Sequence, residues 1–423
     1  MTNHRLITSL ITGFLFLFNL QFAHSCSTYK VTAGGKTMVG SNYDTWFESP
    51  RIWFETTGYG ASFSGARQDG QNGFAPQTGL NEFGLAFVTL ATATPENGIP
   101  PSNKKRIENR TNYLKDILHK CKTTDEVKEY IDKYDHSSLS QDVFFYIDSA
   151  GNYLVVEPYN ILSGNDAKYV LANFCPSTIK DFDEIKQVRY KKGVAFLQNK
   201  IDTSIEFCTS LSDTMHVCRE KIGDGTLLTS ILDLNSGIIY LNFYHDYNHQ
   251  VKFNLKEELA KGEHTFEIVS LFPPNEEFKK MTSFKTPLNS ASLDLFLKCC
   301  LVLFLFSAFA FLISYFRKKS SVKLLLFALS LILMYYMFVL ATEVGIFYNP
   351  APYKDYKFTM LNIAAYIPFL LLLLIVPLFV INKKIFNDNR WTFFPKWLFV
   401  LNNLAYISLI VLFSYWGLYN VFG

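Results

Sequence analysis

The stretch CSTYKVTAGGKTMVGSNYD, Cys26–Asp44, determines the fold of this chain. Residues 26–32 alternate in the manner of a β-strand, Gly34 and Gly35 form a turn, and residues 37–42 return as a second strand. Glycine pairs between two alternating runs are typical of a β-hairpin. The closing residues 40–44 bring Asp44 back beside Cys26, so the sequence predicts a hairpin with a thiol and a carboxylate at one end.

The chain around this hairpin alternates between strand and helix patterns, without a Pro/Gly/Ser-rich linker up to residue 292. The mixture of strands and helices predicts one α+β layered domain over 26–292. Thr123 to Glu126 has the form of a capping box that opens a helix. The expected helices are 106–121, 124–134 and 180–199; the expected strands are 143–147, 153–157, 227–234 and 238–244.

Residues 1–25 have the pattern of a secretory signal peptide. Arg5 precedes an apolar run from Leu6 to Phe22, and Ala23 and Ser25 occupy the −3 and −1 positions of a cleavage site. Cleavage there makes Cys26 the first residue of the mature protein. The alternatives are an uncleaved anchor and a lipoprotein signal that acylates Cys26.

The C-terminal part, 293–423, is predicted to be a membrane domain. Four apolar runs, about 293–316, 322–345, 358–381 and 395–420, are long enough to cross a bilayer as helices. Lysine and arginine gather in the first and third connections, which indicates that these loops are cytoplasmic. We therefore expect a multi-pass membrane protein whose 26–292 domain is extracytoplasmic. In the alternative, the membrane tail carries the main function, and the chain is a polytopic membrane protein with a sensor ectodomain.

Composition restricts the partners. Charged residues make up 18% of the chain and hydrophobic residues 49%. This excludes a disordered chain and a basic nucleic-acid binder. The expected partners are the lipid bilayer and a small molecule, with no nucleic acid; the oligomeric state is open.

Some cysteine and histidine positions have the spacing of a cross-link or a metal site. Cys208 and Cys218 are close in sequence, and in an exported domain they are the expected disulfide, although spacing does not decide connectivity. His245 and His249 resemble a metal cluster, but we interpret both as surface residues at a strand end. No metal or other cofactor is predicted.

An N-terminal cysteine has a specific chemical use. Its α-amino group, with a pKa near 8, can take the proton of its own thiol, so one residue supplies nucleophile and base. Attack on an amide carbonyl then requires donors for the oxyanion. Asp44 can hold the ammonium group, Asn173 follows a predicted strand, and Arg189 lies in a predicted helix.

These residues resemble the N-terminal-nucleophile (Ntn) cysteine hydrolases of the linear-amide type, which include choloylglycine hydrolase, isopenicillin N acyltransferase peptidases and acid ceramidase. The family's opening Cys-Thr-x-Phe is similar to residues 26–29, and its Gly-Arg-Asn-x-Asp to residues 40–44. Its Gly-Met-Asn-Glu-x-Gly-Leu is similar to residues 79–85, and its Thr-Asn strand end to residues 172–173. The resemblance covers most of residues 26–250 and none of the tail.

The resemblance implies an αββα sandwich with Cys26 as nucleophile and base, Asp44 as orienting carboxylate, Asn173 as oxyanion donor and Arg189 as support. It further implies Asn42 and Asn81 as substrate-binding or supporting residues, although the turn at 81–84 is also expected to be structural. The implied activity is hydrolysis of, or acyl transfer from, linear N-acyl amides through a thioester, by an Ntn-type amidohydrolase acting on non-peptide carbon–nitrogen bonds.

Two departures from the family pattern leave alternatives open. Ser41 replaces the family's arginine, and only Thr89 and Thr92 follow where a second asparagine is usual in the bile-salt branch. A catalytically inactive relative that binds an amide ligand or a partner as a membrane receptor is therefore the alternative function. A papain-like pair of a cysteine with His216 or His245 is the alternative mechanism.

Overall fold

The computed structural model describes residues 26–95, 98, 103–219, 224–343, 345–348, 359–388 and 391–420. The predicted signal peptide lies outside these residues. The chain forms two compact units that divide between Ser283 and Phe284. The predicted boundary at residue 292 stays a prediction.

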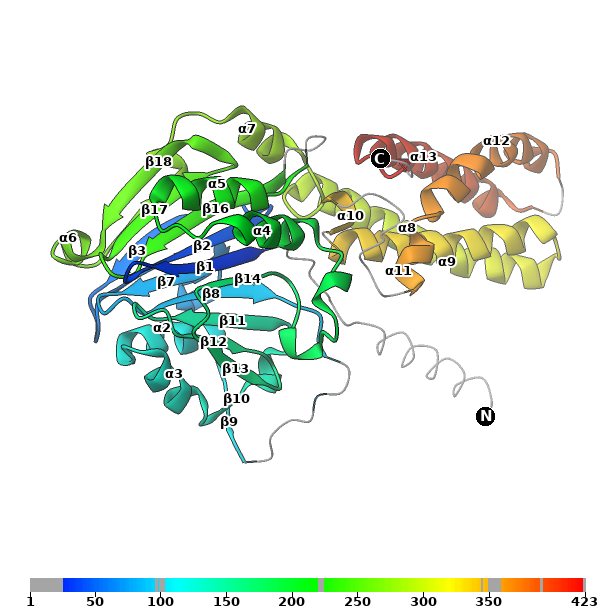
Figure 1. Cartoon of the computed structure of the whole chain (residues 1–423). Coiled ribbons are helices and arrows are strands. Elements are labelled where there is room, and N and C mark those ends of the chain that lie inside the picture. Colours follow the sequence, from blue (N-terminus) through cyan, green and yellow to red (C-terminus); the bar gives the residue numbers. More distant parts are fainter. Residues whose placement is uncertain are drawn as a thin grey trace. The chain divides into compact units, whose positions relative to one another are not determined.

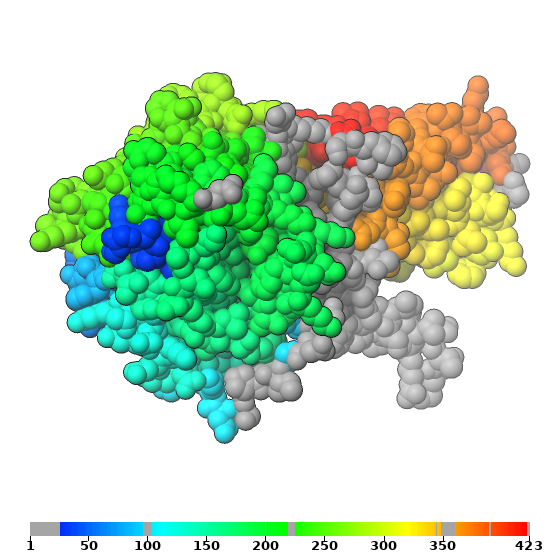
Figure 2. Space-filling view, in the orientation of Figure 1, coloured from blue at the N-terminus to red at the C-terminus, as the bar shows by residue number. Residues whose placement is uncertain are grey.

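The first sheet has the order β14-β1-β2-β16-β17-β18, with β15 paired to β16, and all its pairs are antiparallel. Its central hairpin is the one predicted from the sequence, and it is almost entirely buried. In Figure 2 the dark-blue surface is a small patch, in agreement with the exposed turn at Gly34 and Gly35. The strands are β1 (Ser27–Ala33), β2 (Lys36–Thr45), β14 (Lys168–Leu171), β15 (Cys218–Arg219), β16 (Asp224–Asp233), β17 (Ile238–Phe243) and β18 (Asp246–Asn254).

The second sheet has the order β13-β12-β11-β8-β7-β4-β3-β19 and is also antiparallel. Its strands are β3 (Arg51–Glu55), β4 (Ala61–Gly65), β7 (Thr78–Asn81), β8 (Ala86–Ala91), β11 (Asp142–Ile147), β12 (Tyr153–Val156), β13 (Ile161–Gly164) and β19 (His264–Glu267). Two short pairs lie outside both sheets: β5 (Arg67–Gln68) with β6 (Phe74–Ala75), and β9 (Lys105–Arg106) with β10 (Tyr134–Asp135).

Helices cover the outer faces of both sheets (Figure 1). They are α2 (Arg110–Lys120), α3 (Thr124–Ile131), α4 (Val188–Asn199) and α5 (Ile205–Met215). Two further helices, α6 (Leu255–Leu259) and α7 (Glu276–Ser283), pack against the core between the sheets. Short 3₁₀ turns are η1 (Gly70–Asn72), η2 (His136–Leu139), η3 (Pro176–Thr178), η4 (Phe182–Glu184) and η5 (Ile268–Leu271). The Thr123 cap is confirmed, because its Oγ1 accepts from Glu126 N at 3.3 Å.

Three apolar clusters show that the domain has four layers. Because side chains alternate along a strand, neighbours in β2 serve different interfaces. Met38 packs with Leu211 of α5, whereas Val39 belongs to the core between the two sheets. A third cluster joins Phe87 of the second sheet to Leu114 of α2. The predicted αββα sandwich is therefore confirmed.

The helix predicted over 180–199 is shorter than expected. Residues 182–184 form the turn η4, and α4 begins only at Val188. Ile185, between η4 and α4, has extended backbone and is buried in the inter-sheet core, so the helix does not extend back through this residue.

Within its described residues the C-terminal unit has four helices that are long and apolar enough to cross a membrane, as predicted. They are α8 (Ala291–Arg317), α9 (Ser321–Thr342), the stretch Met360–Phe386, which covers most of α11 (Thr359–Ala364) and all of α12 (Ile367–Phe386), and α13 (Phe393–Tyr415). A short helix, α10 (Gly345–Tyr348), follows α9. Within this unit Asn402 Nδ2 of α13 donates to Ser307 Oγ of α8 at 2.7 Å. Such a buried polar contact between apolar helices is typical of membrane bundles.

Candidate active site

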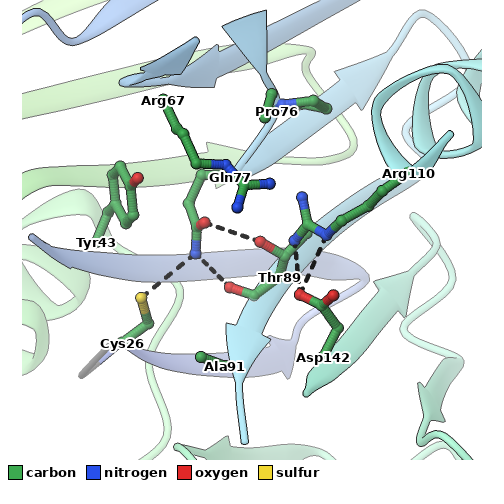
Figure 3. A pocket seen from close by; sticks show the side chains of 10 residues that line it. Cys26, Tyr43, Arg67, Pro76, Gln77, Thr89, Ala91, Arg110 and Asp142 are labelled. Atoms are coloured by element: carbon green, nitrogen blue, oxygen red, sulfur yellow. Dashed lines mark hydrogen bonds and ion pairs between the residues drawn. The ribbon is translucent and has the colours of Figure 1, made fainter. Parts of the chain in front are cut away.

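Cys26 lies directly before β1 and is 1% exposed. Ser27 pairs with Asn42, so β2 continues past Cys26 through Tyr43 and Asp44. The Cys26 side chain belongs to the core between the two sheets. Its Sγ accepts a hydrogen bond from Gln77 Nε2 at 3.5 Å (Figure 3). The thiol is thus held between the layers, within reach of a fixed donor.

A cavity of about 50 Å³ lies beside this thiol. Its polar walls come from separate elements (Figure 3). Gln77 directly precedes β7, Thr89 lies in β8, Arg67 in β5 and Arg110 in α2. Arg110 is fixed by Asp142 of β11, whose Oδ1 accepts from Nη2 at 2.9 Å and from Nε at 3.1 Å. The cavity therefore joins one thiol, one amide and two guanidinium groups.

Gln77 is the donor that the sequence analysis missed. Its amide is oriented by Thr89, whose Oγ1 donates to Gln77 Oε1 at 2.8 Å, while Gln77 Nε2 also donates to the Thr89 carbonyl oxygen. β7 and β8 pair Thr78 with Val88, which places Gln77 opposite Thr89. Counting the register back from the predicted turn at Asn81 would have identified this pair. Thr89, one of the threonines that follow Leu85, thus orients the amide and is not itself the donor to Sγ.

The surroundings of Cys26 set the protonation of its thiol. Burial raises the pKa of Cys26 to about 12, and the negative charge of Asp44 acts in the same direction. A hydrogen bond from the Asp44 backbone and the charges of Arg189 and Arg110 act to lower it. In this environment the thiol is protonated at neutral pH, so a base must remove the proton before Sγ can act as a nucleophile.

Asp44 is 4% exposed and lies at the end of the hairpin predicted to carry it. It pairs with Thr226 across β2 and β16, and Thr226 Oγ1 donates to Asp44 Oδ1 at 2.5 Å. The pairing of Ser27 with Asn42 brings Asp44 to the Cys26 end of the hairpin, where burial first and then the charge of Asp44 raise the pKa of Cys26.

Arg189 links Asn173 to Cys26. Arg189 Nε donates to the Cys26 carbonyl oxygen at 3.3 Å, and Arg189 Nη2 donates to Asn173 Oδ1. Asn173 Nδ2 donates to the Ala91 carbonyl oxygen at 2.7 Å. Gln187, the N-cap residue of α4, makes two hydrogen bonds with the Asn173 backbone: its Oε1 accepts from Asn173 N, and its Nε2 donates to the Asn173 carbonyl oxygen. Four residues predicted from the sequence, Cys26, Asp44, Asn173 and Arg189, are thus gathered at one end of the first sheet.

Asn42 and Asn81 do not line the cavity. Asn42 Nδ2 donates to the Ser212 carbonyl oxygen of α5 at 2.9 Å, on the helix side of the sheet. Asn81 forms the turn between β7 and β8, because its Oδ1 accepts from Leu85 N at 3.0 Å and Gly84 has φ +78°. These contacts indicate that both asparagines support the backbone. They do not indicate direct binding of substrate.

The expected disulfide partners lie in different surroundings. Cys208 is buried with Tyr29 in the cluster beneath α5. Cys218, in β15, donates to Glu277 Oε2 at 3.7 Å. Their pairing stays a prediction.

Comparison with known proteins gives likenesses in structure only. No family model and no curated protein matches the chain. A variant of conjugated bile acid hydrolase from Clostridium perfringens shares 18% identity, with 59% of this chain and 97% of that chain covered and a TM-score of 0.45. Penicillin V acylase from Agrobacterium tumefaciens shares 12% identity, with 57% and 91% covered and a TM-score of 0.45.

Proposed function

We propose that this protein is a membrane-anchored Ntn-type hydrolase or acyltransferase that acts on linear N-acyl amides, with Cys26 as the nucleophile of the mature N-terminus. One observation supports this most strongly: the Cys26 thiol lies in a cavity with a fixed amide donor, while Arg189 binds the carbonyl group of the same residue. A cysteine buried only for packing needs neither contact.

The proposed reaction uses the α-amino group that signal cleavage would release. This amine takes the proton of Sγ, and the thiolate attacks the amide carbonyl carbon to form a C–S bond and a tetrahedral oxyanion. Collapse of the oxyanion breaks the C–N bond, and the α-ammonium returns its proton to the leaving amine. The product is a thioester on Cys26, from which water or a second amine takes the acyl group.

Fixed donors would stabilise the oxyanion. Gln77 Nε2 already points at Sγ, and Asn173 is held beside Cys26 through Arg189. Asp44 would bind the α-ammonium and keep it next to the thiol. Donors fixed before the reaction stabilise the developing charge without reorganising, which is the largest contribution in many acyl-transfer enzymes.

The size of the cavity favours a narrow substrate. A volume of about 50 Å³ holds a reacting amide group, whereas sites that enclose a whole small molecule occupy roughly 300–1,000 Å³. The acyl chain and the amine would therefore extend away from the thiol. The four apolar helices would keep the enzyme at a membrane, and we propose that its domain faces the extracytoplasmic side.

A catalytically inactive receptor for amides is the second candidate, because of Ser41. Its side chain is 2% exposed, and its Oγ has no hydrogen-bond partner among the described residues. The family pattern has an arginine at this position. The cations near the thiol, Arg110 and Arg189, come from other elements and favour the enzyme over the receptor.

The test is N-terminal sequencing of the mature protein together with intact-mass analysis during incubation with a panel of N-acyl amides. We expect Cys26 at the N-terminus and a mass increase of one acyl group that maps to Cys26. An active protein with a blocked or lipidated Cys26 would contradict the mechanism. Binding of an amide without acylation or turnover would support the receptor.

A further inference from the structure

A second group of reactive side chains lies away from the cavity, where β15, the β17–β18 turn and α7 meet. The ligand atoms of Cys218, His245 and Glu277 all lie within 4.8 Å of one another. Glu277 Oε2 is 2.8 Å from His245 Nδ1 and 3.7 Å from Cys218 Sγ. A thiol, an imidazole and a carboxylate are the three side-chain types that bind zinc.

The turn that carries His245 is unusual in its residues. Tyr244 and His245 both have φ +51°, and Phe243 pairs with Asp246, so they form a two-residue turn of the type that favours Asn-Gly. Residues with a Cβ are strained in this conformation. Tyr244 packs against Phe278 at 5.1 Å between ring centroids, which accounts for Tyr244 but not for His245.

His245 is not the surface residue that the sequence analysis expected. Its side chain is 4% exposed, compared with 56% for His249. Its Nε2 is buried and has no hydrogen-bond partner in the described part of the chain. The atom on the side of the cluster is Nδ1, which meets Glu277 Oε2, and a strained, buried imidazole beside a carboxylate suits a ligand better than a surface residue.

We propose that Cys218, His245 and Glu277 bind a zinc ion. In a tetrahedral site the sulfur–oxygen separation is about 3.5 Å and the nitrogen–oxygen separation about 3.3 Å, given the usual zinc–ligand bond lengths. The observed separations from Glu277 Oε2 are 3.7 Å to the sulfur and 2.8 Å to the nitrogen, and the sulfur and the imidazole nitrogen lie within 4.8 Å of each other. Binding of zinc would bring these three atoms to the tetrahedral separations. Water would complete the coordination, because the three-residue cluster leaves one tetrahedral position open.

Zinc at this position would also fix the strand next to Asp44. Val217, the neighbour of Cys218, donates its N–H to Thr226 Oγ1 at 2.9 Å and accepts from Thr226 N at 2.8 Å. The same Thr226 hydroxyl donates to Asp44. Any consequence for catalysis rests on the proposed function, whereas zinc binding does not.

The experiment measures zinc on the full chain in detergent, stripped with a chelator and then titrated with Zn²⁺ against a chromophoric competitor. It is done in the Cys26→Ala background, because an N-terminal aminothiol would itself bind zinc. This choice also separates the result from the proposed function. We expect one zinc per chain, and with Co²⁺ a thiolate-to-metal charge-transfer band.

The variants have matched controls. Glu277→Gln and Cys218→Ser should each weaken zinc binding by about 100-fold, and Cys218→Ser should abolish the cobalt charge-transfer band. Glu276→Gln, the exposed neighbour, and His249→Ala should leave both measurements unchanged. His245→Gly removes a ligand at a turn position that favours glycine. The variant should therefore still fold, and its zinc affinity should fall by about 100-fold.

Three results would overturn the proposal. The first is zinc bound at less than one equivalent by the parent protein. The second is zinc affinity that is the same in the parent, Cys218→Ser and His245→Gly. The third is a Cys208–Cys218 disulfide in peptide maps of the native protein, since that bond would remove the thiolate.

Discussion

Cys26 and Cys218 both lie at the start of a strand in the same sheet, yet their neighbours differ in charge. Burial and the charge of Asp44 raise the pKa of the Cys26 thiol, while Arg189 and Arg110 act to lower it, and an amide donor faces its sulfur. The Cys218 thiol faces the carboxylate of Glu277 and the ring of His245. Donors and cations stabilise a thiolate that attacks carbon, whereas a carboxylate and an imidazole complete a site for a cation. Under the two proposals, the neighbouring side chains, and not the thiol itself, set the chemistry of each cysteine.

The largest expected effect tests whether Cys26 is the nucleophile. Cys26→Ala should reduce kcat by about 10³-fold or more, because no thioester can form. Cys26→Ser should retain little activity, since an alkoxide is much harder to generate than a thiolate. Rates of amide cleavage by the full chain measure this. Cys299→Ser, an exposed cysteine in α8, is the control and should keep full activity.

Arg189 tests whether a cation distinguishes the two thiols. Arg189→Ala removes the bond to the Cys26 carbonyl oxygen and the one to Asn173, so kcat should fall by about 10²-fold. Arg189→Lys should recover only part of this, because a lysine cannot bridge both partners. Lys192→Ala, exposed on the same helix, is the matched control. Equal rates for Arg189→Ala and Lys192→Ala would contradict the role.

Gln77 is expected to have a smaller effect. Gln77→Ala removes one donor beside Sγ and should lower kcat by about 10- to 100-fold, with KM changed less, because the donor acts on charge that develops in the transition state. Gln68→Ala, exposed on β5, provides the comparison. An increase in KM alone would show that Gln77 binds substrate without stabilising the oxyanion.

Asp44 should change reactivity in opposite directions in two assays. Its charge raises the pKa of Cys26, so Asp44→Asn should lower that pKa and speed alkylation of Cys26 by iodoacetamide below pH 9. Turnover should fall, because the α-ammonium loses its partner. Mass-spectrometric mapping compares Cys26 with Cys175, which should react at the same rate in both proteins. Slower alkylation of Cys26 in the variant would contradict the claim that Asp44 raises the pKa of Cys26.

Residues close in sequence were predicted well. Alternation and a glycine pair placed β1 and β2, a threonine placed the cap of α3, and hydropathy placed the four long apolar helices. Each of these depends on interactions within a few residues or on segment length, which the order of amino acids contains directly. The hairpin also fixed Asp44 at the Cys26 end, because a short turn leaves only one register.

Alternation, turn residues and hydropathy predicted the hairpin, the layered fold class and the apolar tail. Which side chains lie together depends on tertiary packing. Gln77 and Arg110 reach Cys26 from the second sheet and from α2, and Glu277 reaches His245 from α7. These contacts depend on how sheets stack and on which face each strand turns inward. Layer packing arises from the whole chain. The local pattern around Gln77 therefore identifies its pairing with Thr89 but not its contact with Cys26, and the pattern around His245 does not identify Glu277.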